Sequence, residues 1–389
     1  MNPSGELGLF VFIDAFGWEL ARKYPFLDDV LVTKQPLGTI FGYSSTCDPT
    51  ILTGKLPREH GHFSFFYHNP AESPFGICRL LRFLPRSITR RGRVRRVMSR
   101  VIRRFYGYTG YFQIYNMPFR YLPLFDYSEK RDIYQKGGIN GGCPTIFDHL
   151  RDHRIPFYLS DWRASEEWNL ATLKTELEAG KIRFGYLYMA AMDAVLHAHG
   201  TDSARVADKI RWYEQQLRTV LELARQRYSQ VRVYVFSDHG MTDTVGDVDL
   251  IGRIDALGFR LGVDFNAVYD STMARFWFFN PRARERIIEA LGGEKRGRIL
   301  TRDDLAEYGC DFPDAKYGEL FFLLDPGQLL CPSFMGEKSL AGMHGYAPDH
   351  KDSVALFASN VVPATMPRRL DDLYDLMLRE VSAPTGVSA

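Results

Sequence analysis

Three short apolar segments, each followed by an aspartate, constrain the fold of this chain more than any other feature of its sequence. They end at Asp14 (GLFVFID), at Asp193 (RFGYLYMAAMD) and at Asp238 (VRVYVFSD). Continuous apolar runs with polar borders are typical of strands buried on both faces of a parallel sheet. Helical periodicity between them, clearest at residues 203–228, predicts an α/β fold with a mostly parallel central sheet sandwiched by helices.

Composition restricts the class of protein further. Of 389 residues, 45% are hydrophobic and 25% are charged, which suffices for a large core and excludes a disordered or fibrous chain. The five cysteines form no CxxC pair, so we expect neither a disulfide framework nor a thiolate zinc site. The sequence starts without a basic signal-peptide region and has no apolar run of about 20 residues. We therefore expect a cytoplasmic location.

Two regions interrupt the alternation of strand and helix patterns. Residues 61–135 are rich in aromatic residues and arginine, and residues 255–335 mix strand-like runs with turn signals. Segments inserted over the edge of a sheet commonly form loops and lids that determine specificity. We therefore expect residues 1–389 to form a single domain, in which residues 61–135 and 255–335 are two cap insertions.

Six side chains of metal-ligand type follow the predicted strands or stand in a glycine-flanked turn. They are Asp14, Asp193, His197, Asp238, His239 and His344. Because the carboxyl ends of parallel strands meet at one edge of a sheet, we expect the three aspartates to lie close together. An aspartate after a strand is often only a helix cap, and a DxxxH pair is often a surface contact. In combination, three carboxylates and three imidazoles exceed one tetrahedral site and suit two divalent ions about 4 Å apart, most simply zinc, with manganese as the alternative.

The segment GYSSTCDPTILTGKLPREHG, residues 42–61, resembles the nucleophile region of the alkaline phosphatase superfamily, in the branch of type I phosphodiesterases and nucleotide pyrophosphatases. In that family the nucleophile stands nine residues before the threonine of a TG pair, which is Ser44 here, counted from Thr53. The motifs DAVLH (193–197), SDHGM (237–241) and HGY (344–346) follow in the family's order. The resemblance covers residues 8–61, 140–250 and 338–365, and it implies the fold of that superfamily.

The resemblance also implies a role for each candidate residue. Asp193, His197 and His344 correspond to the ligands of one metal ion. The second ion corresponds to Asp14, Asp238 and His239, with Ser44 bridging the two ions as nucleophile. The implied activity is a metal-dependent hydrolase that cleaves a phosphodiester or pyrophosphate bond through a phosphoseryl intermediate. Metal coordination is one recognised way to activate a serine hydroxyl.

One departure from the family pattern affects the nucleophile segment. Cys47 stands where the phosphodiesterase branch often has an asparagine that contacts a phosphoryl oxygen, and a thiol is a weak donor. Asp48 and Pro49 together would also make a good helix start. This leaves Ser45 and Thr46 as rival nucleophiles, although the spacing from the TG pair favours Ser44.

Alternative functions use the same residues. A phosphomonoesterase or phosphotransferase would need the same two metal ions, whereas a sulfatase is disfavoured because the chain lacks a CxPSR-like motif. A membrane-surface binding protein with a structural metal site is an alternative of another class, but structural zinc needs only four ligands. We assign no metal role to the remaining histidines of note, His60, His62, His199 and His350. The glycine cluster at 137–142 lacks the K[ST] of a phosphate-binding P-loop and predicts a loop.

The first insertion contains an unusual basic segment. Between Glu72 and Asp126 there are twelve arginines and no acidic residue in 53 positions. Residues 90–105 predict an amphipathic helix whose apolar stripe comprises Val94, Val97, Met98, Val101, Ile102 and Phe105. Such a helix either binds an anionic membrane surface peripherally, next to a lipid-linked substrate, or packs as a cap whose arginines steer anionic substrates. Nucleic acid is a less favoured partner, because no nucleic-acid-binding motif surrounds the segment.

Overall fold

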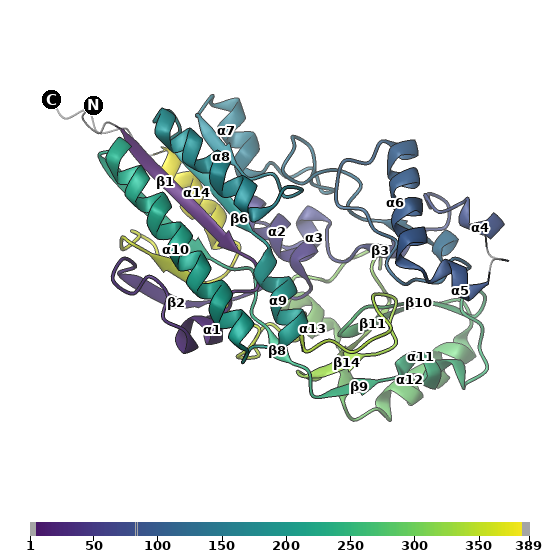
Figure 1. The fold of residues 1–389 in the computed structure, drawn as a ribbon. Coiled ribbons are helices and arrows are strands. Elements are labelled where there is room, and N and C mark those ends of the chain that lie inside the picture. The colour runs from purple at the N-terminus through teal and green to yellow at the C-terminus, as the bar shows by residue number, and fades with distance from the viewer. Residues whose placement is uncertain (1–4, 82, 84, 383–389) are drawn as a thin grey trace.

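The computed structural model describes residues 5–81, 83 and 85–382, and a six-stranded sheet lies at its centre (Figure 1). Its strands are β1 (Glu6–Ile13), β2 (Thr33–Leu37), β5 (Phe157–Leu159), β6 (Phe184–Met189), β7 (Gln230–Phe236) and β16 (Ala355–Ser359). The strand order is β2-β16-β7-β1-β6-β5. The neighbours from β7 to β5 pair in parallel, and β16 runs antiparallel to both β7 and β2. The predicted mostly parallel sheet is confirmed.

Helices cover both faces of this sheet. Successive side chains of β1 point to opposite faces and are apolar on both, so each face needs a packed layer. Leu9 and Val11 pack on one side and Phe10 and Phe12 on the other, all fully buried. The first layer contains α1 (Trp18–Lys23), α8 (Glu166–Ala179), α9 (Ala191–His199) and α10 (Ala204–Arg227). The second contains α2 (Ser44–Thr53), α7 (Ile146–Asp152) and α14 (Asp372–Ser382). The predicted sandwich of helices around the sheet is confirmed.

The two regions expected as insertions share one hydrophobic core. The second region contains an antiparallel sheet of β10 (Phe265–Tyr269), β11 (Met273–Phe278), β13 (Leu320–Leu324) and β12 (Gly297–Ile299), in that order. The first contains the pair β3 (Phe66–His68) and β4 (Phe125–Tyr127). Phe66 and Phe125 belong to the same buried cluster as Phe265 and Phe276. The two segments therefore pack together, while the proposed domain boundaries stay predictions.

Short elements connect the central sheet to these segments. The helices are α3 (Pro57–His60), α4 (Cys78–Leu81), α5 (Arg86–Thr89), η1 (Leu122–Leu124), α11 (Leu250–Asp255), α12 (Pro281–Gly292) and α13 (Arg302–Glu307). Two small pairs join β8 (Thr242–Asp243) to β15 (Gly342–Met343) and β9 (Gly246–Val248) to β14 (Gln328–Leu330). The first of these pairs holds the segment that contains His344 beside the segment that follows β7.

The arginine-rich helix exists, but the rest of the protein covers only part of its apolar stripe. Helix α6 spans Gly92–Tyr106. Val94, Met98 and Ile102 pack against the cap core, whereas Val97, Val101 and Phe105 are exposed. The protein therefore covers only part of the predicted stripe, and polar side chains complete the inward contact. Arg95 is buried there and donates hydrogen bonds to the carbonyl oxygens of the segment 114–117.

No helix in the described part of the chain is long and apolar enough to cross a lipid bilayer. All five cysteines are free, and three of them are buried, namely Cys47, Cys78 and Cys310. Burial raises the pKa of the Cys47 and Cys310 thiols well above the ordinary value, so both are neutral side chains of the core.

Candidate metal centre and nucleophile

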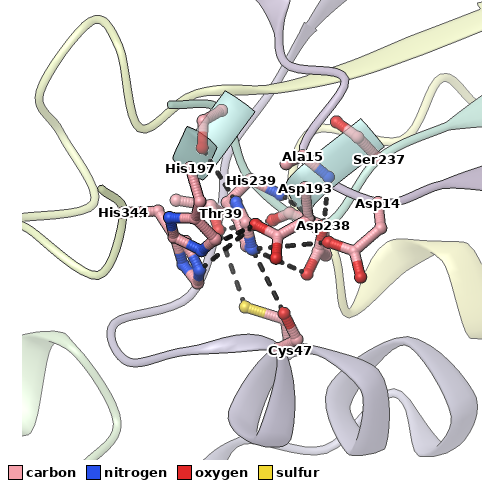
Figure 2. Close-up of polar contacts among 12 residues, drawn as sticks. Asp14, Ala15, Thr39, Cys47, Asp193, His197, Ser237, Asp238, His239 and His344 are labelled. Atoms are coloured by element: carbon pink, nitrogen blue, oxygen red, sulfur yellow. Dashed lines mark hydrogen bonds and ion pairs between the residues drawn. The ribbon is translucent and has the colours of Figure 1, made fainter. Parts of the chain in front are cut away.

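The six predicted ligands meet at the carboxyl edge of the parallel strands. Asp14 follows β1, Asp238 follows β7, and Asp193 and His197 lie on α9, directly after β6. They form two groups, Asp193–His197–His344 and Asp14–Asp238–His239, and the ligand atoms of each group lie within 4.8 Å of one another. Figure 2 shows the carboxylates and imidazoles of both groups pointing toward one another. The grouping is the one that the family resemblance implies.

The first group is oriented by helix α9 and by the backbone. Asp193 Oδ1 lies 3.2 Å from Nε2 of His197 and 3.5 Å from Nε2 of His344. His197 stands one helical turn after Asp193, which places both side chains on the same face. Nδ1 of His197 donates a hydrogen bond to the carbonyl oxygen of Gly342 at 2.8 Å. This bond turns Nε2 toward the cluster, the arrangement typical of a metal-binding histidine.

In the second group, too, a backbone carbonyl orients the histidine. Nδ1 of His239 donates to the carbonyl oxygen of Gly240 at 2.8 Å. Its Nε2 therefore faces Asp238 Oδ2 at 3.1 Å and Asp14 Oδ1 at 3.8 Å. Tyr188 donates its hydroxyl to the other oxygen of Asp14 at 2.9 Å. The rings of His239 and His344 stack with centroids 3.7 Å apart, so the two groups are immediate neighbours.

The donor atoms of the two groups fit divalent cations. One oxygen of each aspartate, Oδ1 of Asp14, Oδ1 of Asp193 and Oδ2 of Asp238, is buried without a hydrogen-bond partner. Leaving a buried acceptor unsatisfied costs about 1–3 kcal/mol, and more for a charged group. Burial and the neighbouring carboxylates of Asp238 and Asp193 raise the pKa of Asp14 well above its ordinary value. Divalent ions held by these carboxylate and imidazole ligands would offset the charge of the crowded carboxylates.

Ser44 is the first residue of α2, and Oγ lies 3.2 Å from Nε2 of His239. Gly42 makes this strand-to-helix turn with φ = 129°, a conformation that favours glycine. The amide groups of Ser44 and Ser45 precede the first hydrogen bond of the helix, which Thr46 donates to the carbonyl of Tyr43. Free amides at a helix N-terminus suit a phosphoryl oxygen. The structure thus places a hydroxyl and backbone donors beside the ligand cluster.

The rival hydroxyls are bonded elsewhere. Those of Ser45 and Thr46 both donate to the carbonyl oxygen of Phe63, and Thr46 is fully buried. The helix begins at Ser44 with Pro49 in its interior, so the alternative helix start at Asp48 and Pro49 is wrong. Of the three candidates, Ser44 has its hydroxyl next to a candidate ligand, His239.

The Cys47 thiol is held by the segment that precedes α2. Its Sγ lies 3.8 Å from the hydroxyl of Thr39 and 3.7 Å from the carbonyl oxygen of Ile40 (Figure 2). The side chain is buried, so it offers no donor to the space in front of Ser44. The expectation that phosphoryl contacts come from other groups therefore agrees with this geometry.

A cavity of about 600 Å³ extends from Ser44 into the cap. Phe65, Tyr111 and Tyr115 line it from the first insertion, and Trp162 lines it from the segment after β5. Asp48, Glu129, Asp132 and Asp270 add carboxylates to the wall, while Arg131 and Lys338 are the basic side chains among the described lining residues. Sequence reasoning missed these walls. Their aromatic composition was visible, but their convergence from distant segments was not.

The histidines without an assigned metal role lie outside both groups. His60 Nε2 bonds the hydroxyl of Thr50 at 3.0 Å, and Nε2 of His62 accepts from the amide of Asn140 at 2.9 Å. His199 is exposed, and Nδ1 of His350 accepts a long hydrogen bond of 3.4 Å from the amide of Asp352. The contacts of His60, His62 and His350 are those of structural side chains. The glycine cluster at 137–142 lies in a loop, as predicted.

Glu129, in the cavity wall, gives a testable pH dependence. Burial and the nearby Asp132 raise the pKa of Glu129 to about 8 from its ordinary value of 4.5. Between these values the unfolded chain has lost this proton and the folded chain retains it, so stability falls as pH rises. Relative to Glu129→Gln, the unfolding free energy of the wild type should fall by up to about 1.4 kcal/mol per pH unit in this window. Denaturant unfolding of both proteins, with Glu285→Gln as an exposed control, measures the difference. Parallel profiles for wild type and Glu129→Gln would refute it.

Comparison with known proteins agrees with the geometry. A search of curated protein sequences finds no significant match. Among solved structures, murine ectonucleotide pyrophosphatase/phosphodiesterase 5 superposes with a TM-score of 0.67 at 16% identity, over 97% of this chain and 95% of that one. An inactive form of the murine protein in complex with AMP gives 0.66 at 16% identity, again over 97% and 95%. The human counterpart gives 0.66 at 15% identity, over 97% and 94%. At such identities these likenesses establish the fold alone.

The family follows from the sequence as a whole. A model of the type I phosphodiesterase/nucleotide pyrophosphatase family matches residues 9–346, which span every candidate ligand and the nucleophile segment. The match confirms the resemblance seen in the nucleophile segment and in the motifs around the ligands. The chain belongs to the type I phosphodiesterase/nucleotide pyrophosphatase family and is a phosphodiester hydrolase.

Proposed function

We propose that this enzyme cleaves a phosphodiester or pyrophosphate bond by a two-metal mechanism in which Ser44 is the nucleophile. The observation that carries the proposal is the position of Ser44 Oγ, 3.2 Å from Nε2 of His239, beside two groups of three ligand atoms. Asp193, His197 and His344 would hold one divalent ion, and Asp14, Asp238 and His239 the other. Bound zinc, or manganese in its place, would lower the pKa of the Ser44 hydroxyl and neutralise phosphoryl charge.

The residues of the chain then have defined roles. Ser44 Oγ forms a bond to phosphorus while the bond between phosphorus and the leaving oxygen breaks, and the leaving group departs with a proton. The product is a phosphoseryl ester on Ser44. Water hydrolyses that ester and restores the hydroxyl. The amides at the start of α2 face the phosphoryl oxygens, replacing the donor that Cys47 does not provide. Tyr188 and the carbonyls of Gly240 and Gly342 hold the ligands in orientation.

The cavity favours a diester over a monoester. A space of about 600 Å³ in front of Ser44 accommodates the second ester group of a diester. Four further carboxylates line the wall but add little net charge, because Asp132 and Asp270 are each paired with an arginine at 3.0 Å and burial raises the pKa of Asp48 and Glu129. The size of the cavity therefore supports a phosphodiesterase over a phosphomonoesterase or phosphotransferase.

We expect kcat/KM for bis-p-nitrophenyl phosphate to exceed that for p-nitrophenyl phosphate by at least about 10-fold, a difference of about 1.4 kcal/mol in transition-state binding. Both substrates release the same chromophore, so one assay with zinc- or manganese-loaded enzyme measures both. Faster turnover of the monoester would favour the phosphomonoesterase alternative. Metal binding without turnover of either ester would favour a binding protein with a structural metal site.

The organic half of the substrate is expected to be planar or apolar, because aromatic side chains form much of the cavity wall. Phe65 stacks on Tyr115 at 5.4 Å between centroids, and Tyr111 lies 6.1 Å from Trp162. A panel of dinucleotides, nucleotide sugars and lipid-linked pyrophosphates, followed by phosphate release or product chromatography, ranks these substrate classes. Lipid-linked substrates belong in the panel because of the basic helix α6.

A further inference from the structure

Helix α6 carries an exposed apolar ridge that its sequence alone does not reveal. Val97, Val101 and Phe105 follow at intervals of four residues and are 55%, 50% and 81% exposed. The inward side of the helix is already occupied by Val94, Met98 and Ile102, which pack on the cap core. The ridge therefore faces solvent, although the adjoining face of the helix packs on the cap core. Exposed apolar rows of this kind commonly mark an interaction surface.

Exposed arginines lie alongside the ridge. They are Arg93, Arg96, Arg100, Arg103 and Arg104. None of them forms an ion pair with a described residue, whereas neighbouring Arg90 is paired with Glu337 at 3.0 Å. At 100° per residue these five positions form one sector of the helix, and the ridge borders that sector. The outer surface of α6 thus combines uncompensated positive charge with apolar side chains, which we call the basic ridge.

The basic ridge does not belong to the substrate cavity. No residue of α6 is among the described residues that line the cavity. Figure 1 shows α6 with α4 at the end of the molecule opposite the chain termini, and Leu80 of α4 adds a side chain that is 78% exposed. The alternative role, in which the arginines directly cap the site, therefore lacks support from this geometry.

We propose that the basic ridge docks the enzyme on the surface of an anionic lipid bilayer. The arginines match anionic headgroups, and Val97, Val101 and Phe105 match the boundary between headgroups and acyl chains, where basic amphipathic helices lie. A nucleic acid would satisfy the arginines but would leave the apolar ridge in water. Buried Arg95 joins α6 to the segment 114–117 through its carbonyl oxygens, and this segment contributes Tyr115 to the cavity wall. A docked α6 would therefore hold one wall of the cavity near the lipid surface.

Flotation with lipid vesicles tests the proposal on the full chain. Wild-type protein should float with phosphatidylcholine/phosphatidylserine vesicles at about 10 mM salt, where charges act over about 30 Å. It should float at least about 10-fold less with phosphatidylcholine alone, or at about 1 M salt, where screening shortens the range to about 3 Å. Failure of the wild type to float with the anionic vesicles at low salt would overturn the proposal.

Three variants separate a specific surface from general positive charge. Arg93, Arg96, Arg100 and Arg103, all changed to Gln, should reduce vesicle binding by at least about 10-fold. The same change of charge at exposed Arg205, Arg225, Arg282 and Arg302 is the matched control and should preserve binding. The triple change Val97→Ser, Val101→Ser and Phe105→Ser should weaken binding while the charge is kept. Equal losses in the two arginine variants, or unchanged binding of the triple variant, would contradict docking through the basic ridge.

Turnover of bis-p-nitrophenyl phosphate in solution should be unchanged in all three variants, because none of these residues lines the cavity. This readout distinguishes failure of the docking proposal from failure of the proposed function. If the proteins float as expected while the wild type shows no diesterase activity, the docking proposal is supported and the proposed mechanism is contradicted. The expected cytoplasmic location of the enzyme stays a prediction.

Discussion

Ser44→Ala should lower kcat/KM for bis-p-nitrophenyl phosphate by at least about 10³-fold, because removing a serine nucleophile commonly costs that much or more. The change deletes the oxygen that attacks phosphorus, and it alters no other contact of the ligand groups except the 3.2 Å approach to His239. Metal content and the midpoint of thermal unfolding should stay close to those of the wild type. Steady-state kinetics, elemental analysis and calorimetry on the same preparation measure all three quantities.

Ser45→Ala is the matched control for this prediction, since the two serines are adjacent. It removes a long hydrogen bond of 3.4 Å to Phe63 and should retain most of the rate. Thr46→Ala removes a buried hydrogen bond and should reduce stability by about 1–3 kcal/mol without abolishing turnover. Loss of turnover in a folded Thr46→Ala protein, with an active Ser44→Ala protein, would identify Thr46 as the nucleophile. A normal rate in all three variants would instead indicate direct attack by water.

His197→Ala should lower kcat/KM by at least about 10²-fold, since even the outer-shell partners of metal ligands contribute about 10–100-fold. His197 supplies Nε2 to one group of ligands, and its Nδ1 is held by the carbonyl oxygen of Gly342. His199→Ala is the matched control, because His199 lies on the same helix, is exposed and belongs to neither group. Equal losses of activity in the two variants would contradict the assignment of His197 as a ligand.

The sequence was sufficient to predict the central sheet and the convergence of the candidate ligands at its edge. Each apolar segment that ends in an aspartate is a strand of the sheet or leads directly from one, and parallel strands bring their carboxyl ends to one edge. The grouping of His344 with Asp193 came from the family resemblance. In the structure it depends on the pairing of Gly342–Met343 with Thr242–Asp243, which no local pattern predicts.

The basic helix shows that a local sequence pattern does not predict which side chains of a helix the rest of the protein will cover. Periodicity predicted an apolar stripe on residues 94–105, but it could not show how much of that stripe the protein covers. Arg95 and Ser99 occupy part of the inward face, where Arg95 bonds carbonyl oxygens and the hydroxyl of Ser99 accepts from the amide of Ile114. The ridge of Val97, Val101 and Phe105 is left outside as a result.

The cavity walls were beyond sequence reasoning for a different reason. Phe65, Tyr111, Glu129 and Trp162 stand far apart in the chain and carry no motif. Only the folded cap places them around the space in front of Ser44. The raised pKa of Glu129 is likewise a product of burial and of its neighbour Asp132, and neither follows from its position in the sequence.

Metal stoichiometry is the most direct test of the two-metal account. Elemental analysis of the chelated protein, reloaded with zinc or manganese and freed of excess ion, should give about two ions per wild-type chain. The Ser44→Ala protein should hold about two as well, and the His197→Ala protein about one, because each group of three ligands holds its own ion. A wild-type chain that binds at most one ion after either metal is supplied would contradict the account.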